Sequence, residues 1–407
     1  MAWLAPYRVI DLTDERGLLA GQMLGKLGAD VIQVEPPGGS TARAVGPFDD
    51  AGRSCYWSAY AAAKRGVSLD IANPAGREIL LSLVAGADFL IESAAPGHLA
   101  SISLDHSTLM TRNPRLIHVS ITAFGSSGPK AGYAASDLVL WAAGGPLHPH
   151  RDGDGPPLRM SAPQAWLHAA ADGAGGALVA HFARLRSGAG QHVDISAQQS
   201  VAQATLSSIT AAAVGDTTFA TEMRARAAAG AGVKWRASDG LVELMLPAGP
   251  AMGSWSNNLF NLMRREAALP AALQDWDWAT LPARMETGEI GPDHVAAARA
   301  AVADFLALHT KRELGEMAMA NKILMAPCNT MNDLLESPHL AFRELFAAVG
   351  ESEVRRTLPW AFAKGPVGMF AEPRGAPGLG QHNAEVYGDL LGLSADRLDA
   401  LRVEGVI

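Results

Sequence analysis

The sequence predicts an α/β protein with a parallel sheet, because short β-rich runs alternate with helical stretches through its first third. Strands are expected at residues 8–12, 30–34, 67–71, 88–92, 116–121 and 192–196. Helices are expected between them at residues 17–27, 74–85, 104–111 and 164–185. This alternation is typical of βαβ units, in which each helix connects two parallel strands.

A change in composition near residues 200 and 321 divides the chain into three segments. Residues 1–200 are predicted to form the first part of a large, Rossmann-like α/β domain. Residues 201–322 are predicted to form a small inserted domain with its linkers, which contains a strand pair around residues 233–246 and several tryptophans. Residues 323–407 are expected to return to the large domain and to end in a helix.

Composition excludes several classes of protein. The net charge of −8 argues against a nucleic-acid partner, since such domains usually carry a basic stripe. The two cysteines, Cys55 and Cys328, do not make a secreted disulfide framework. The chain begins without a basic and then apolar leader pattern, and no apolar run reaches the length of a bilayer. We therefore expect a cytoplasmic protein with no membrane partner.

Two common small-molecule sites are disfavoured. A dinucleotide site needs G-x-G-x-x-G after the first strand, but this turn reads DLTDERGLLAG, with Asp14 and Glu15 where a phosphate would lie. A group of metal-ligand residue types lies in a Gly- and Pro-rich loop, without a helix or ribbon to fix its geometry. We expect no metal site there; the group comprises His148, His150, Asp152 and Asp154.

Six sequence blocks carry a resemblance to a known family. They are LGADVIQVEPPGG (27–39), KRGVSLDIANPAGREILLSLVAGADFLIES (64–93), NPRLIHVSITAFGSSGP (113–129), RLRSGAGQHVDIS (184–196), APCNTMNDLLESPHLAFRELF (326–346) and LLGLSADRLDALRVEGVI (390–407). In this order they resemble the class III coenzyme A transferases, which include formyl-CoA transferases, carnitine CoA-transferases and α-methylacyl-CoA racemases. The resemblance implies a large α/β domain, an inserted small domain and an interlocked dimer. Residues 200–321 carry little of it.

The resemblance also implies a reaction whose usual nucleophile this chain lacks. Family members use an aspartate near the start of the long helix to attack an acyl-CoA thioester, which gives a mixed anhydride and free CoA thiolate. Counted back from the RLRSG block, that position falls on Trp166, or on Ala165 with a shift of one residue. Asp172 is the nearest acid, about two helical turns further on, and is a weak candidate for the nucleophile.

Other family positions differ as well. The family's E-N-aromatic-R-P-G segment, which borders CoA, reads ESAAPG here, so Ser93–Ala95 lack the amide, aromatic and guanidinium groups. A racemase would have histidine before Asp137, where this chain has Ser136. For any retained binding of CoA or acyl-CoA, the resemblance points to Lys64, Arg65, Phe124 and Gly125.

Three functions remain open. The first is the subunit of a two-subunit class III CoA-transferase, such as a benzylsuccinate CoA-transferase, that lacks the catalytic aspartate and pairs with a related, aspartate-bearing chain. The second is a self-sufficient acyl-CoA transferase with a rearranged site. The third is a non-catalytic acyl-CoA binding or regulatory protein. In the first two, the substrates are an acyl-CoA and a carboxylic acid.

Overall fold

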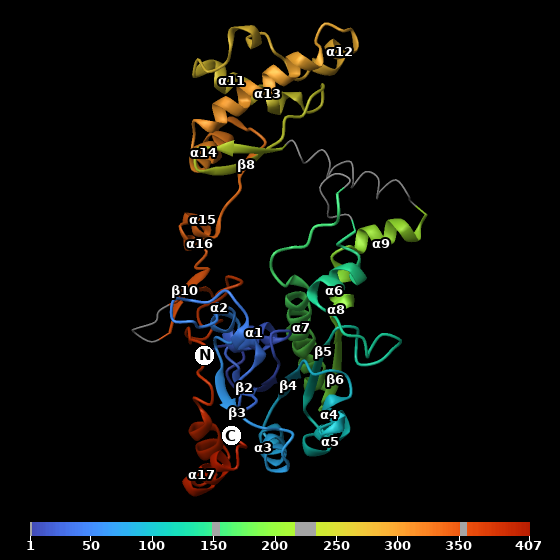
Figure 1. Cartoon of the computed structure of the whole chain (residues 1–407), viewed down its shortest axis with the longest axis vertical. Coiled ribbons are helices and arrows are strands. Elements are labelled where there is room, and N and C mark those ends of the chain that lie inside the picture. The colour runs from blue at the N-terminus through green and yellow to red at the C-terminus, as the bar shows by residue number, and fades with distance from the viewer. Residues whose placement is uncertain (1, 149–154, 216–232, 351–355) are drawn as a thin grey trace. The chain divides into compact units, whose positions relative to one another are not determined.

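The computed structural model describes residues 2–148, 155–215, 233–350 and 356–407, so His150, Asp152 and Asp154 lie outside the described residues. The described chain divides into two compact units (Figure 1), and each unit is described by itself. Unit 1 takes residues 2–148 and 157–215 and the described part of 338–407. Unit 2 takes residues 155–156 and 233–337.

Unit 1 contains a sheet of six parallel strands in the order β3-β2-β1-β4-β5-β6. This sheet confirms the predicted α/β class. Because the order reverses between β1 and β4, the loops that follow these two strands meet at the carboxyl edge of the sheet, where α/β proteins usually bind ligands. The strands are β1 (Arg8–Leu12), β2 (Asp30–Glu35), β3 (Arg65–Ser68), β4 (Phe89–Glu92), β5 (Ile117–Thr122) and β6 (Gln191–Ser196).

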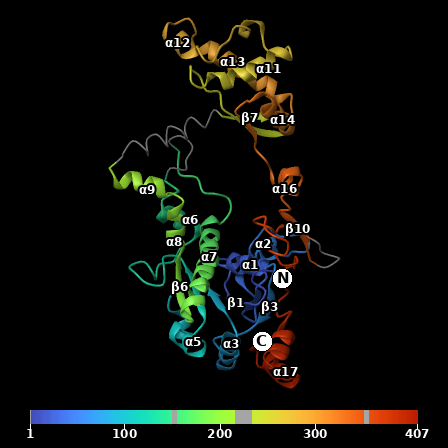
Figure 2. The ribbon, with the colours of Figure 1, turned by 180° about the vertical axis from the view of Figure 1, so that it is seen from behind.

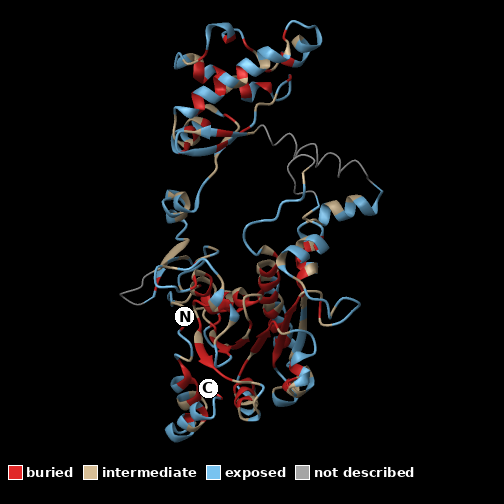
Figure 3. Cartoon of the chain, viewed as in Figure 1, coloured by how far each residue is buried: buried red, intermediate tan, exposed pale blue. Residues whose placement is uncertain are grey.

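Apolar side chains alternate between the two faces of this sheet, as the pleat requires. Val9 packs in the core beneath α1 (Leu18–Lys26) and α7 (Gln164–Ser187), whereas its neighbour Ile10 packs with α3 (Pro74–Ala85), α5 (His106–Arg112) and α17 (Ala395–Val403). The sheet is thus covered on both sides over its inner strands, and β1, β2, β4 and β5 form the most buried part of unit 1, whereas the edge strand β6 is largely exposed (Figure 3).

Helix α7 lies close to the sheet because its inner face consists of alanine and glycine. A Cβ atom added at Gly173 would come within 3.0 Å of Ile121, and one added at Gly176 within 2.9 Å of Val193. The same inner face includes Ala169, Ala170, Ala174, Ala177 and Ala180. Small side chains therefore fix the height of α7 above β5 and β6, with the helix start at the carboxyl edge of the sheet.

The remaining elements of unit 1 connect or flank this layered core, as the front and rear views show (Figures 1 and 2). Two strands, β10 and β11, form a separate antiparallel pair. These elements are η1 (Thr41–Ala44), α2 (Cys55–Tyr60), α4 (His98–Ser101), α6 (Asp137–Gly144), α8 (Ala197–Gln203), α9 (Leu206–Ala213), α16 (Pro338–Phe342), β10 (Phe346–Val349), β11 (Arg356–Pro359) and the π-helical turn η3 (Ala384–Leu390).

Unit 2 has its own antiparallel sheet and an aromatic core. Strand β7 pairs with β8, which confirms the strand pair predicted around residues 233–246, and β8 also pairs with β9. Trp276 and Trp278 pack edge to face against each other and beside Phe260. The elements are β7 (Lys234–Ala237), β8 (Gly240–Leu244), α11 (Gly253–Arg265), η2 (Ala271–Leu273), α12 (Leu281–Glu286), α13 (Pro292–Ala307), α14 (Lys311–Asn321), β9 (Met325–Pro327) and α15 (Met331–Leu335).

Some element and unit boundaries differ from the predicted ones. The predicted division at residues 200 and 201 falls inside α8, which packs with α6 and α7 in unit 1. Residues 323–337 lie in unit 2, because β9 completes the small sheet. Strand β3 ends at Ser68 and not at residue 71, since the chain turns there and the Asp70 N–H bonds to the carbonyl of Val406.

Among the helices of the described residues, none is both long enough and apolar enough to cross a membrane.

A buried lysine joins four elements of unit 1. The Nζ atom of Lys64 donates hydrogen bonds to Asp11 Oδ2 at 2.7 Å, Gln33 Oε1 at 2.8 Å and the Leu18 carbonyl at 2.9 Å. The Lys64 side chain is 0% exposed. An ammonium has three N–H donors, so all of them are used inside the protein. Helix α1 can approach this group only because it has Gly21 there, where an added Cβ would lie 1.9 Å from Asp11.

We predict that Lys64→Met destabilises the protein by roughly 3–5 kcal/mol, because the substitution leaves the Asp11 carboxylate buried without its cation. Denaturant unfolding followed by circular dichroism measures this change. Lys130→Met, at an exposed position, is the matched control. Equal stability of the two variants would contradict a structural role for Lys64.

Candidate functional site at the carboxyl edge of the sheet

Trp166 lies in the first turn of α7 and is 8% exposed. The guanidinium carbon of Arg16 lies 6.0 Å from the centre of its ring. Asp137 accepts a 2.8 Å hydrogen bond from the backbone N–H of Ala165, so its carboxylate caps the start of α7. The position where the resemblance places a nucleophile therefore holds a buried indole between an arginine and a helix cap.

Asp137 caps a helix, and the pKa of its carboxyl group is raised above the usual value. Burial raises its pKa, although the backbone N–H groups of Ala165 and Trp166 act in the opposite direction. Ser136 performs the corresponding task for α6, since its hydroxyl accepts from the Val139 N–H. Residues 136 and 137 thus satisfy the free backbone donors of two helix starts.

The loops after β1 and β4 meet through Asp14 and Ser93. The Ser93 hydroxyl accepts from the Asp14 N–H at 3.1 Å and donates to Asp14 Oδ1 at 2.9 Å. Arg16 binds the same carboxylate through Nε at 2.8 Å and through Nη2. Burial acts to raise the pKa of Asp14, but the hydrogen bond and charge of Arg16 prevail and lower it. Asp14 is therefore an ionised partner of Arg16.

Two tyrosines of α2 complete this side of the site. The Tyr56 hydroxyl donates to the carbonyl of Glu15 at 2.6 Å, and its ring lies 4.6 Å from that of Tyr60. Burial raises the pKa of Tyr56, and the nearby acids Glu15 and Asp14 raise it further. Both tyrosines are therefore neutral at physiological pH, and Tyr56 fixes the backbone beside the Asp14–Arg16 pair.

Sequence reasoning missed the group formed by Asp14, Arg16 and Ser93. From the sequence, the DLTDERG turn was interpreted only as evidence against a dinucleotide site. The ESAAPG segment was interpreted only as a loss of the family's contacts to CoA. The partners Asp14 and Ser93 lie 79 residues apart in the chain. The available signal was that each lies within two residues of the end of a parallel strand.

The predicted CoA-binding residues do not come together as one site. Lys64 is buried with all three donors used, which leaves none for a phosphate. Arg65 binds both oxygens of Asp30, at 2.9 and 2.6 Å, and Glu385 at 2.7 Å. Both side chains hold the sheet and η3 in place, which differs from the phosphate-binding role that the resemblance suggested.

Phe124 and Gly125 lie on the loop after β5. The Phe124 ring packs against the edge of Tyr133 and lies 5.9 Å from Lys130 Nζ. Gly125 has a φ of +93°, a conformation that favours glycine. The next backbone N–H, that of Ser126, is already bonded to the Asp194 carboxylate at 3.0 Å. The loop therefore has a fixed shape, with one of its donors occupied.

Asp172, the weak candidate for the nucleophile, is exposed on α7. Its neighbours Gly173 and Ala174 form the buried face of the helix, so its carboxylate belongs to the solvent side. It does not join the buried Trp166 and the half-buried Asp14 at the carboxyl edge.

Glu92, the last residue of β4, lies beside a group of three histidines on β5, β6 and α5. Burial raises the pKa of Glu92, whose Oε1 atom lies 3.8 Å from His118 Nε2. The rings of His106, His118 and His192 lie 4.8–5.5 Å apart. The described residues hold no group of three or more ligand side chains arranged to hold a metal ion. Burial, and to a lesser extent the two other histidines, lower the pKa of His118 to about 3.

We predict that His118 lowers the stability of the fold as the pH falls from about 7 to 5. The unfolded chain takes up a proton near pH 6.5 that folded His118 refuses down to about pH 3, so this residue alone costs about 2 kcal/mol over that range. His118→Gln should flatten the pH dependence of the unfolding free energy by that amount, as measured in denaturant. His98→Gln, at an exposed position, is the matched control, and equal slopes for the two variants would contradict the prediction.

The chain is similar to known proteins in both sequence and fold. Succinyl-CoA:(R)-benzylsuccinate CoA-transferase subunit BbsE of Thauera aromatica is 31% identical over 415 residues, which cover 98% of this chain and 97% of that protein. Succinyl-CoA–D-citramalate CoA-transferase of Chloroflexus aurantiacus is 28% identical over 410 residues, which cover 96% and 94%. The fold matches the crystal structure of a CAIB/BAIF family protein from Brucella suis with a TM-score of 0.78, at 24% identity, over 96% and 99% of the two chains.

The model of CoA-transferase family III matches residues 4–383, which include Trp166 and the residues described around it. Enzymes of this kind use CoA thioesters as substrates. The match confirms the resemblance carried by the six sequence blocks: the chain belongs to CoA-transferase family III.

Proposed function

We propose that this chain is the subunit of a two-subunit class III CoA-transferase that lacks the nucleophilic aspartate. In this proposal a related, aspartate-bearing chain supplies the carboxylate, and the two exchange CoA between carboxylic acids. The observation that carries the proposal is Trp166, which is buried in the first turn of α7 where family members have the nucleophile.

The surrounding acids support this proposal because each has another task. A nucleophilic carboxylate must be free to approach the thioester carbonyl. Asp14 is bound by Arg16 and Ser93, and Asp137 caps α7. Asp172 is exposed on the outer side of that helix. An indole cannot form an acyl anhydride, so Trp166 offers no substitute.

The relatives support the proposal in two ways. BbsE, which aligns along nearly the whole chain, is itself named as a subunit of a CoA-transferase. The two relatives described above are both named for succinyl-CoA as CoA donor. We therefore propose succinyl-CoA as the first donor to test. For contact with CoA, we keep Phe124 and Gly125 as proposed residues and assign Lys64 and Arg65 to holding the fold.

A self-sufficient enzyme with a rearranged site is the second candidate. The observation in its favour is Asp137, whose carboxyl group lies at the start of α7 and has a raised pKa. A non-catalytic acyl-CoA binding protein is the third candidate. It differs from the first in needing no aspartate-bearing partner.

We predict that the purified chain alone shows no CoA exchange between succinyl-CoA and labelled carboxylic acids. Loss of a covalent nucleophile typically costs several powers of ten in rate. Trp166→Asp should leave activity absent, because Ser93–Ala95 still lack the family's contacts to CoA. Trapping with hydroxylamine and peptide mapping is the measurement. A hydroxamate on Asp137, Asp14 or Asp172 would favour the self-sufficient enzyme, while activity gained only with an aspartate-bearing partner would favour the first candidate.

We also propose that the chain assembles as an interlocked dimer with that partner, and that the family topology makes the lone chain unstable as a folded monomer. Sedimentation velocity at micromolar concentration, with and without the partner, tests this. The expected result is a dimer in the mixture. A stable, folded monomer that stays separate from the partner would count against both the dimer and the two-subunit proposal.

A further inference from the structure

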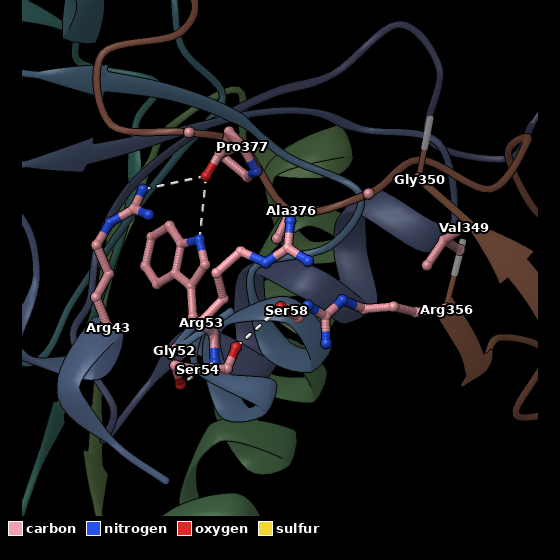
Figure 4. Close-up of a pocket in the computed structure, with 13 residues that line it drawn as sticks. Arg43, Gly52, Arg53, Ser54, Ser58, Val349, Gly350, Arg356, Ala376 and Pro377 are labelled. Carbon is pink, nitrogen blue, oxygen red and sulfur yellow. Dashed lines mark hydrogen bonds between the residues drawn. The ribbon is translucent and has the colours of Figure 1, made fainter. Parts of the chain in front are cut away.

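A cavity with arginine side chains in its wall lies in unit 1, on another side of α2. It has a volume of about 350 Å³, and the described residues that wall it lie in the η1–α2 segment and at positions 349–350, 356 and 375–378 of the C-terminal arm (Figure 4). Consecutive helical side chains point about 100° apart. Tyr56 accordingly faces Glu15 at the carboxyl edge, while Trp57 faces this cavity. The two sites are separate although they share a helix.

The walls of the cavity are joined by specific contacts. Trp57 Nε1 and Arg43 Nη2 both donate to the Pro377 carbonyl at 3.1 Å. The Arg43 guanidinium stacks on the Trp57 ring at 3.9 Å. From the opposite wall, Arg356 reaches across and binds Asp49 on the segment before α2. The cavity is therefore built by two distant parts of the chain held at a fixed separation.

Among the described residues at this cavity, positively charged side chains outnumber the carboxylates that pair with them. Arg43 is neutralised by Glu35, which it binds at 2.6 and 2.8 Å. Arg53 and Arg356 share Asp49 as their acidic partner within the described residues. The N–H of Arg53 and then the two guanidiniums lower the pKa of Asp49 to about 2, so that carboxylate is ionised. Counted over the described residues alone, three arginines against two carboxylates leave one positive charge, in a chain whose net charge is −8.

The unpaired charge comes with hydrogen-bond donors. Arg53 uses its backbone N–H and Nε on Asp49, at 2.8 and 2.9 Å, and the described residues give its two Nη atoms no partner. Arg356 uses Nη2 on Asp49 and makes a 3.8 Å contact from Nη1 to Cys55 Sγ. The two side chains extend toward the middle of the cavity in Figure 4. Planar guanidiniums arranged in this way match the oxygens of a phosphate or carboxylate.

We propose that this cavity is an oxyanion-binding site, in which Arg53 and Arg356 hold a phosphate or carboxylate group of a small organic molecule. The cavity exceeds the size of an inorganic ion, and Val349, Ala376 and Pro377 provide an apolar wall for the rest of the ligand. Bound there, the anion links the α2 segment to the C-terminal arm. The site stands apart from Trp166, so it does not depend on the function proposed for the carboxyl edge.

Calorimetric titration of the full chain with three probes tests the site: inorganic phosphate, adenosine 3′,5′-bisphosphate and succinate. We expect binding of at least one probe, with an affinity about tenfold lower in Arg53→Gln, because one charge-assisted contact is lost. Arg53→Lys should recover part of the affinity. Arg397→Gln, which removes a surface arginine paired with Glu404, is the matched control and should bind as the wild type does.

The probes also distinguish the source of the oxyanion. Preference for the bisphosphate assigns the cavity to a phosphorylated nucleotide group, and preference for succinate assigns it to a dicarboxylic acid; both support an oxyanion site. Absence of binding by all three probes up to about 10 mM would overturn the proposal. Equal affinity of Arg53→Gln and the wild type would overturn it too. Arg53 is half exposed, so its replacement leaves the buried core intact.

Discussion

The buried Lys64 ammonium is the constraint on which the rest of unit 1 depends. A charge removed from water is tolerated only where partners replace its hydration, and here three oxygens do so at hydrogen-bond distance. Asp11 is the penultimate residue of β1, Gln33 lies on β2 and Leu18 begins α1, so the three cannot move independently. The network therefore fixes where β1 ends and where the loop that follows it begins.

The Lys64 network determines the positions of the side chains at the carboxyl edge, because it holds the end of β1. With the end of β1 held by Asp11, the next turn places Asp14 against Ser93 of the β4 loop. Arg16 then reaches from Asp14 toward Trp166, whose height is set by the alanine and glycine face of α7. The polar network beneath α1 thus positions Asp14, and the small side chains beneath α7 position Trp166. Both constraints are needed to place these two side chains on either side of Arg16.

Local pattern predicted the elements well, because strand and helix periods depend on near neighbours. Strand β1 and helix α3 begin and end at the predicted residues. Strand β3 ends before its predicted last residue, since its end is set by a hydrogen bond to Val406 at the far end of the chain. The role of Lys64 was not predictable from its neighbours, because a basic pair before a strand looks the same in a surface turn. Burial and three distant acceptors decide its role, and only the folded chain brings them together.

The position of Trp166 could be found by counting along the chain, but its meaning depends on contacts. A chain that loses one nucleophile can recruit another only if a nearby carboxylate is left without a partner. Asp14 is ionised and held by a guanidinium, and Asp137 is committed to two backbone N–H groups at a helix start. Both acids therefore serve to hold the shape of the edge. Because these polar groups already satisfy each other, the arrangement supports the proposal that another chain carries the nucleophile.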